Sequence, residues 1–317
     1  MKNLAFNFFA ITLLGLFLIS CSKNSPETIK IGVLNGPSAV SFIKMMDQPS
    51  VIDGKKVEII QKNEPQQIQA MMMQGKLDFA ILPTVMAANL YNKGVHYTMV
   101  ACPVWGTLYV LTNGSAKKIS DLKNETISVF GQSSTSDVLL QRLIQKNKVP
   151  DVMIDYTLGT NTDIAQALEM KKIEFAVVSE PLVSRLLAQD STIHIVSKLD
   201  CEEFMINSDK NVFVQTSFLV SDKFVKHNPA AIAQVCKAYS GSCNFINEQP
   251  EKAAKLLVKH KLASDINLAK RSIPLCNIHY VAAFAIDKEI ELYLNIFYNF
   301  NPKSIGGKMP DSEFIYQ

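Results

Sequence analysis

Cysteine, histidine and tryptophan are scarce in this sequence of 317 residues, which contains six, five and one of them. Apart from Cys21, whose position is treated below, an odd number of cysteines remains. They cannot all pair, so a disulfide framework is not supported, although which of them pair is left open. We interpret the five as small buried hydrophobic residues: Cys102, Cys201, Cys236, Cys243 and Cys276.

The histidines form neither a catalytic triad nor a zinc-binding pattern, because they are scattered: His96, His194, His227, His260 and His279. A metal site that includes His279 stays open as an alternative, but no ligand spacing supports it. The run Met71–Met73 favours the buried side of a helix over a metal or haem site. We therefore expect no metal and no cofactor.

The chain also has no large excess of one charge. It contains 32 lysines and arginines and 29 aspartates and glutamates, for a net charge of +3. No block of basic residues occurs anywhere in the chain. This absence argues against a nucleic-acid partner.

One long apolar run is present, from Phe8 to Ile19, with Lys2 before it. It is shorter than the roughly 20 residues that span a membrane, and residues 1–20 have the layout of a secretory signal. The end of the run, Leu18-Ile19-Ser20-Cys21, resembles the lipobox of bacterial lipoproteins. This resemblance implies cleavage before Cys21 and lipid on its thiol. An ordinary signal peptide with a coincidental cysteine, or an uncleaved anchor, remains the alternative.

A repeat organises the rest of the chain, at a constant offset of 96 positions from Ile31 to Ile127. The segment 31–39 aligns with 127–135, and 66–84 aligns with 162–180 without a gap. In the first pair, each segment is an apolar strand followed by small residues. In the second pair, each segment contains an acidic-Phe-Ala-apolar-apolar string. Two matches at one offset predict two similar α/β units, whose loops occupy equivalent places.

The strongest local signal is the stretch from Glu125 to Leu143, which predicts a buried strand, a turn of small residues and the start of a helix. Gly131 ends the strand, and the turn that follows is rich in hydroxyls: Ser133, Ser134, Thr135 and Ser136. Such a turn presents backbone N–H groups and hydroxyls at a helix N-terminus, a suitable place for oxygen atoms of a ligand.

Strands that alternate with helices predict an α/β fold with mostly parallel sheets flanked by helices. Strands are expected over 28–34, 57–61, 78–82 and 97–101, with helices over 38–46, 66–74 and 85–92 between them. The segments 108–111 and 212–220 are predicted to cross between two lobes and act as hinge strands. Helices follow over 230–247, 251–260 and 287–300.

The resulting domain prediction has four parts. Residues 1–20 form the signal and 21–27 a short polar tether. Residues 28–108 together with 218–317 form a discontinuous first lobe, and residues 109–217 form the second. Removal of the signal leaves 297 residues (317 − 20), enough for two sizeable cores, and no long linker separates the lobes.

Several segments together resemble the substrate-binding proteins of bacterial ABC importers of the nitrate, sulfonate and taurine type, a branch that also includes binders of thiamine precursors. They are the leader with Cys21, GKLDFAILPT, VFGQSSTSDVLLQRL, SFLVSDKFVKHNPAAIAQVCKAY and INEQPEKAAKLL. The resemblance covers almost all of the chain beyond the signal. It implies a two-lobed type II periplasmic-binding-protein fold, a small-molecule solute and an ABC permease in the membrane as partner.

The same resemblance implies four ligand-binding loops, at the places that the repeat marks. They are Asn35, Gly36, Pro37 and Ser38; Pro83 and Thr84; Gly131 to Ser136; and Ser179, Glu180 and Pro181. None contains lysine or arginine, so a bare oxyanion such as nitrate is disfavoured. Glu180 either faces the cleft and favours a ligand with an amine or N–H donor, or is an exposed residue before Pro181. Trp105 either stacks on a flat ligand or belongs to the core.

We therefore expect a solute-binding lipoprotein, a monomer anchored by lipid in the cell envelope and facing the periplasm or the extracellular side. It is not expected to be an enzyme, because nothing pairs a nucleophile with a base. A lyase of the kind found in menaquinone biosynthesis, which has the same fold class, is one alternative. A ligand receptor for a membrane sensor is the other.

Overall fold

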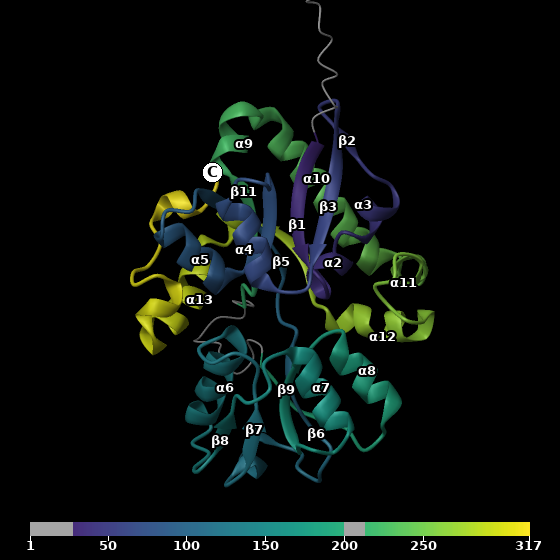
Figure 1. Ribbon diagram of the computed structural model, residues 1–317, viewed down its shortest axis with the longest axis vertical. Helices are drawn as coiled ribbons and strands as arrows, with labels where there is room; N and C mark the ends of the chain where they lie inside the picture. The colour runs from purple at the N-terminus through teal and green to yellow at the C-terminus, as the bar shows by residue number, and fades with distance from the viewer. Residues whose placement is uncertain (1–27, 200–212) are drawn as a thin grey trace, which may run out of the picture.

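A computed structural model describes residues 28–199 and 213–317 (Figure 1). The predicted signal, the tether, the lipidation site Cys21 and also Cys201 lie outside the described residues. Two separate sheets form the centres of two lobes, which Figure 1 shows one above the other.

The first sheet has seven strands in the spatial order β12-β5-β11-β4-β1-β3-β2. Four of them, β5, β4, β1 and β3, run in one direction, while β11, β12 and β2 run against their neighbours. The strands are β1 (Thr28–Leu34), β2 (Val51–Ile52), β3 (Lys55–Lys62), β4 (Phe79–Pro83), β5 (Tyr97–Val104), β11 (Thr216–Ser221) and β12 (Ile278–Ala282).

The second sheet has five strands in the order β10-β6-β9-β7-β8. Here β7 pairs parallel with β8 and β9, and β6 runs antiparallel between β9 and β10. The strands are β6 (Leu108–Thr112), β7 (Thr126–Ser128), β8 (Met153–Asp155), β9 (Phe175–Ser179) and β10 (His194–Lys198).

The chain crosses between the lobes where it was predicted to cross. After β5 it enters the second sheet as β6, and it returns to the first sheet as β11, between β5 and β4. These crossing strands make both sheets mixed instead of mostly parallel, because each runs against the strands of the repeated units beside it. The assignment of 28–108 plus 218–317 and of 109–217 to two moving lobes remains a prediction.

Helices cover both faces of the first sheet, with α4, α5 and α13 on one side and α2, α3, α10 and α11 on the other (Figure 1). The predicted helix over 38–46 is two short helices, since the backbone turns at Ser41 and Phe42. The helices are α2 (Pro37–Val40), α3 (Ile43–Asp47), α4 (Pro65–Met73), α5 (Thr84–Asn92), α9 (Asp222–His227), α10 (Pro229–Glu248), α11 (Pro250–Lys259), α12 (Ile266–Leu275) and α13 (Asp287–Phe300), with short 3-10 turns η2 (Ala283–Ala285), η3 (Pro302–Ile305) and η4 (Ser312–Phe314).

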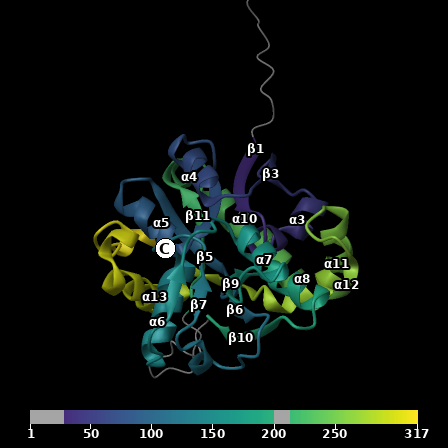
Figure 2. The ribbon, with the colours of Figure 1, turned by 60° about the horizontal axis from the view of Figure 1, so that its bottom comes forward.

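Three helices flank the second sheet, and Figure 2 shows α6 on one side of it and α7 and α8 on the other. Their bounds are α6 (Thr135–Lys146), α7 (Asn161–Glu169) and α8 (Leu182–Gln189), and η1 (Ile119–Leu122) precedes β7. In the described part of the chain, no helix is both long and apolar enough to span a membrane.

The repeat is visible in the register of the two sheets. In the first sheet Ile31 pairs with Phe79, and in the second Ile127 pairs with Phe175, so both partners are displaced by 96 positions. The bounds of α7 and β9 also lie 96 positions after those of α4 and β4. The lobes therefore contain the same strand-helix-strand unit, with equivalent loops at equivalent edges.

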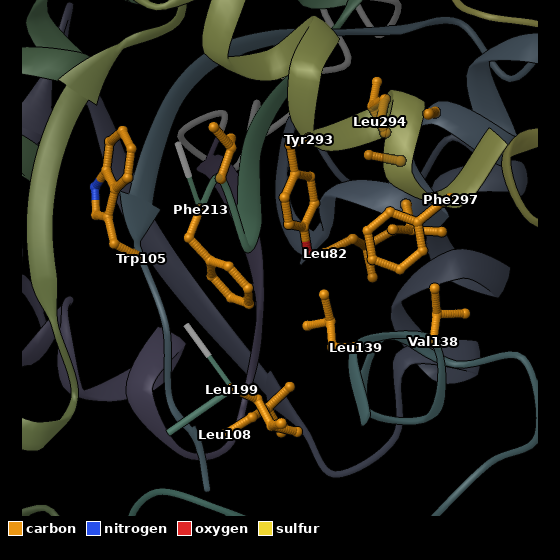
Figure 3. Close-up of a cluster of buried hydrophobic side chains, with 14 of the residues drawn as sticks. Leu82, Trp105, Leu108, Val138, Leu139, Leu199, Phe213, Tyr293, Leu294 and Phe297 are labelled. Atoms are coloured by element: carbon orange, nitrogen blue, oxygen red, sulfur yellow. The ribbon is translucent and has the colours of Figure 1, made fainter. Parts of the chain in front are cut away.

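One hydrophobic cluster continues from one lobe into the other. It joins Leu82 and Tyr293 of the first lobe to Val138 and Leu139 at the start of α6, and Figure 3 shows these side chains together. Two further clusters fill the opposite face of each sheet. The lobes are thus packed on each other beside the crossing strands.

Candidate ligand-binding site

A cavity of about 1230 Å³ lies between the lobes, at the ends of strands from both sheets. Twelve of the residues predicted to bind a ligand line it: Asn35, Gly36, Pro37, Ser38, Pro83, Gly131, Ser133, Ser134, Thr135, Ser136, Ser179 and Glu180. Pro181 lines it as well. The four loops that the repeat marked therefore face one space, and a role for each residue in binding remains a prediction.

Two residues of the predicted set lie elsewhere. Thr84 is fully buried behind the cavity wall, where its Oγ1 accepts a hydrogen bond of 3.0 Å from Ser217 of β11. Trp105 is 7% exposed, belongs to the hydrophobic cluster shared by the lobes and donates through Nε1 to the carbonyl of His279 (Figure 3). It borders a separate hollow of about 620 Å³, so stacking of Trp105 on a ligand in the main cavity is not supported.

The hydroxyl-rich turn is held by its own side chains. Ser134 is the N-cap of α6, and the hydroxyls of Ser134 and Ser136 lie 2.8 Å apart and both reach the carbonyl of Phe130. Gly131 and Ser133 have φ values of 76° and 60°, which fold the turn tightly before the helix. Thr135 and Ser136 are the first two residues of α6, so their amides have no acceptor within the helix and can donate to a ligand.

Asp137 stabilises this turn from behind and does not line the cavity. It is 1% exposed, and its carboxylate accepts hydrogen bonds from the Ser133 amide, from Gln141 and from the Tyr156 hydroxyl. Burial, and then the bond to Asp137, raise the pKa of Tyr156 to about 12.

Five helices of eight residues or more begin at the cavity. Their N-cap residues, all in the lining, are Glu64, Pro83, Ser134, Thr160 and Pro181. The positive end of a helix macrodipole and its unpaired amides favour ligand oxygens with negative charge. The wall thus attracts an oxygen-rich group without a buried lysine or arginine.

Glu180 is the buried acidic group of this lining. It is 2% exposed, which excludes the alternative of an exposed residue before Pro181. Its Oε1 accepts a hydrogen bond of 3.0 Å from Ser184, whereas its Oε2 has no partner among the described residues. Burial raises the pKa of this carboxyl to about 7, and the bonds from Ser184 oppose that shift.

Comparisons with known proteins agree with this architecture. The sequence model described as NMT1/THI5 like matches residues 52–253. The chain belongs to the NMT1/THI5-like family. A search of the curated proteins gave no significant match.

Several solved structures are similar to this NMT1/THI5-like chain. An ABC transporter protein from Parabacteroides distasonis is 30% identical, has a TM-score of 0.80, and the match covers 92% of this chain and 99% of that one. The periplasmic aliphatic sulphonate binding protein SsuA from Escherichia coli is 17% identical, with a TM-score of 0.71 and coverage of 92% and 93%. The alkanesulfonate-binding protein SsuA from Xanthomonas axonopodis pv. citri, bound to MOPS, is 14% identical, with a TM-score of 0.66 and coverage of 92% and 96%. The periplasmic-binding-protein fold expected from the sequence is confirmed.

The site of this NMT1/THI5-like chain also contains residues that the sequence did not indicate. Thr107 and Gln215 join the two crossing segments at the cavity, and Phe130 adds an aromatic side chain to its wall. Others come from the end of β3, from α4 and α5, from the start of α7 and from the C-terminal part of the chain: Gln61, Asn63, Glu64, Gln66, Gln69, Met86, Asn89, Lys93, Thr160, Asn161, Thr162, His260, Lys261, Leu262 and Ser304. The common signal of the repeat, an N-cap at equivalent positions, could have indicated Glu64 and Thr160.

None of the cysteines that the structure describes lines this cavity. Cys236, Cys243 and Cys276 form no disulfide, and burial raises the pKa of each thiol. Cys102 and Cys243 are fully buried, as a small hydrophobic residue would be. Within residues 28–199 and 213–317, no three potential ligands gather in a way that could hold a metal ion.

Proposed function

We propose that this chain is the extracytoplasmic solute-binding component of an ABC importer, which captures a small polar solute between its lobes and delivers it to a membrane permease. The observation that carries the proposal is the shared cavity, into which strand-end loops from both repeated units project. Its size suits a small molecule with room for water or for further closure. The crossing strands supply the place where the lobes bend.

The solute belongs to the sulfonate and taurine-like or the thiamine-precursor-like class. Helix N-termini supply amides for its oxygen atoms, and Phe130 supplies a flat apolar surface. The lysines of the lining, Lys93 and Lys261, are exposed, so the part of the wall that the structure describes has no buried lysine or arginine. That arrangement suits a solute with delocalised or partly balanced charge better than a bare oxyanion.

The proposed role is binding without catalysis. Ser184 pairs its hydroxyl with the carboxylate of Glu180, yet Ser184 is 3% exposed and does not line the cavity. A solute in the cavity therefore has no access to that hydroxyl. Reversible capture needs only the donors and acceptors of the wall.

The proposed location is the outer side of a membrane. The leader and the sequence Leu18-Ile19-Ser20-Cys21 support cleavage and attachment of lipid to Cys21. The lobes enclose the cavity within one chain, which supports a monomer as the binding unit.

The decisive experiment is calorimetry, together with a thermal-shift panel, on the chain without its first 20 residues. The panel contains alkanesulfonates, taurine, aminopyrimidines, amino acids and nitrate. Saturable 1:1 binding by a sulfonate or a pyrimidine, with a rise in Tm through mass action, is expected. Turnover of a bound compound would replace the importer role with an enzymatic one, and binding of nitrate alone would overturn the proposed solute class.

A further inference from the structure

The carboxyl of Glu180 lacks a structural explanation in the fold described above. One of its oxygens, Oε1, is bonded to Ser184, and the other, Oε2, is enclosed and has no donor among the described residues. A buried polar atom without a partner is costly, so such atoms are rare in folded proteins. Glu180 is one of the residues that line the cavity, so this enclosed oxygen lies in or directly beneath the wall of the candidate site.

The repeat provides an internal control for this residue. Thr84 lies 96 positions earlier, at the same place after β4 that Glu180 has after β9. The amide of Thr84 donates to the carbonyl of Gln215, and the amide of Glu180 donates to the carbonyl of Thr107, both at 3.0 Å. The backbone amide of each residue is thus bonded to one of the two segments that cross between the lobes.

The two side chains differ in use. The hydroxyl of Thr84 accepts a hydrogen bond from Ser217 of the crossing strand β11, and Thr84 does not line the cavity. Glu180 makes no side-chain bond to the crossing strand β6, and it does line the cavity. The fold at this position uses the amide of Glu180 and its Oε1, which Ser184 occupies, and leaves Oε2 without a partner among the described residues.

Nothing charged in the described wall satisfies this oxygen. The other titratable residues of the lining are Glu64, Lys93, His260 and Lys261; Glu64, Lys93 and Lys261 are exposed, and His260 is bonded to Asp47. On the side of α12, the neighbouring titratable group is the buried thiol of Cys276. Among the described residues Ser184 alone donates to this carboxylate through its side chain, so a donor that arrives with the ligand would stabilise its ionised form.

We propose that Glu180 determines the specificity of the site by accepting a hydrogen bond from an N–H group of the solute. The solute is then an amino-substituted molecule whose oxygen atoms or ring face the helix N-termini while its amino group meets Glu180. This inference rests on the proposed function and narrows its solute class to compounds that carry an amine or an amino-heterocycle.

Binding of such a solute changes the protonation of the site. Before binding, the raised pKa of about 7 keeps Glu180 mostly protonated at pH 6. An N–H donor favours the ionised carboxylate, so binding at pH 6 releases about one proton per molecule bound. Calorimetry in buffers of different ionisation enthalpy measures this number, and a His260→Gln variant removes the contribution of that histidine.

The test compares two pairs of compounds that differ by exchange of NH₂ or NH₃⁺ for CH₃. The first pair is 2-aminoethanesulfonate and 1-propanesulfonate, and the second is 4-amino-2-methylpyrimidine and 2,4-dimethylpyrimidine. In the unmodified chain, the amino compound of at least one pair is expected to bind ten times or more tightly than its methyl counterpart. In the Glu180→Met variant, the preference for the amino compound is expected to fall below threefold. Glu248→Gln is the control, since it replaces an exposed carboxyl at the end of α10, and it is expected to retain the preference.

The outcomes separate the inference from the function on which it rests. Equal affinity within a pair that binds overturns the role of Glu180 and leaves solute binding intact. Failure of all four compounds overturns the proposed solute class and the inference with it. If Glu180→Met does not fold, the preference of the unmodified chain and its proton release still decide the question.

Discussion

Thr107 and Gln215 hold each other through two hydrogen bonds, although they are 108 positions apart in the chain. The amide of Thr107 donates to Gln215 Oε1 at 2.9 Å, and Gln215 Nε2 donates to Thr107 Oγ1 at 3.0 Å. One residue precedes β6 and the other precedes β11, so the pair ties together the two segments by which the chain crosses between lobes.

Replacement of Gln215 by alanine should destabilise the chain, because it leaves the buried amide of Thr107 without its acceptor. We expect the free energy of unfolding in urea to fall by about 1–3 kcal/mol. In the Gln215→Ala variant, Thr107→Ala should lower the free energy of unfolding by less than it does in the unmodified chain, since the pair is already broken. Additive effects would contradict the coupling, and Gln66→Ala, at an exposed glutamine, serves as the control with a change within about 0.5 kcal/mol.

Glu180→Gln should change how stability depends on pH. The pKa of Glu180 in the folded chain is about 7, above its usual 4.5, so the folded state keeps a proton that the unfolded state has lost. This contribution is present in full below about pH 4.5 and is lost as the pH rises through about 7. The glutamine variant should exceed the unmodified chain by up to about 3 kcal/mol at pH 8 and match it at pH 4. Parallel stability curves from pH 4 to 8 would contradict it.

Two neighbouring residues of the hydroxyl-rich turn should have different roles. Ser134 caps α6, and Ser134→Ala should lower the free energy of unfolding by about 1 kcal/mol. Thr135 lines the cavity, and the described residues give its hydroxyl no partner. Thr135→Val should therefore weaken solute binding by about 1 kcal/mol and leave the Tm nearly unchanged. Unchanged affinity in Thr135→Val would remove this hydroxyl from the site.

Gly36→Ala should be poorly tolerated because of the backbone at this cavity residue. Its φ of 102° and ψ of −149° belong to a region that residues with a Cβ rarely adopt. A loss of about 1–3 kcal/mol in the free energy of unfolding is expected. Gly159, also in the lining, has no positive φ and open space around it, so Gly159→Ala is the matched control with little effect. Equal costs for the two variants would argue against backbone strain.

Cys21→Ser should release the protein from the membrane, because the proposed lipid attaches to this thiol. Fractionation of cells that express the full chain should move the protein from the membrane to the soluble extracytoplasmic fraction. Mass spectrometry of the N-terminal peptide of the unmodified chain should show a lipidated cysteine. An unmodified Cys21 in the mature protein would leave the ordinary signal peptide as the correct interpretation.

The fold and most of the predicted loops followed from local patterns of the sequence. Apolar strands that end in small residues, repeated at one offset, fix both the strand-helix units and the edges where their loops meet. The register of Ile31 with Phe79 and of Ile127 with Phe175 repeats that spacing in the structure. The sequence pattern of one strand-helix unit is sufficient to predict these loops, because each loop lies within such a unit.

The remaining features of the site depend on contacts between segments that are far apart in the sequence. Trp105 lies just before a crossing strand, as expected, but β12 packs beside it and accepts its N–H through His279. Thr84 and Glu180 follow equivalent strands, and only the presence of Ser217 on β11 decides that Thr84 is structural. Nothing local to His260 or Lys261 indicates that the end of α11 reaches the rim of the cavity.

The place of β11 in the first sheet has a consequence for synthesis of the chain. β4 and β5 are made early, but they are neighbours of β11 and have no direct pairing with each other, so the sheet stays open until residue 221 has emerged. The strands of the second sheet lie together between residues 108 and 198 and have all their partners sooner. The later-made half of the repeat is thus the one that can complete its sheet first, and the N-terminal strands stay incompletely paired until the chain returns as β11.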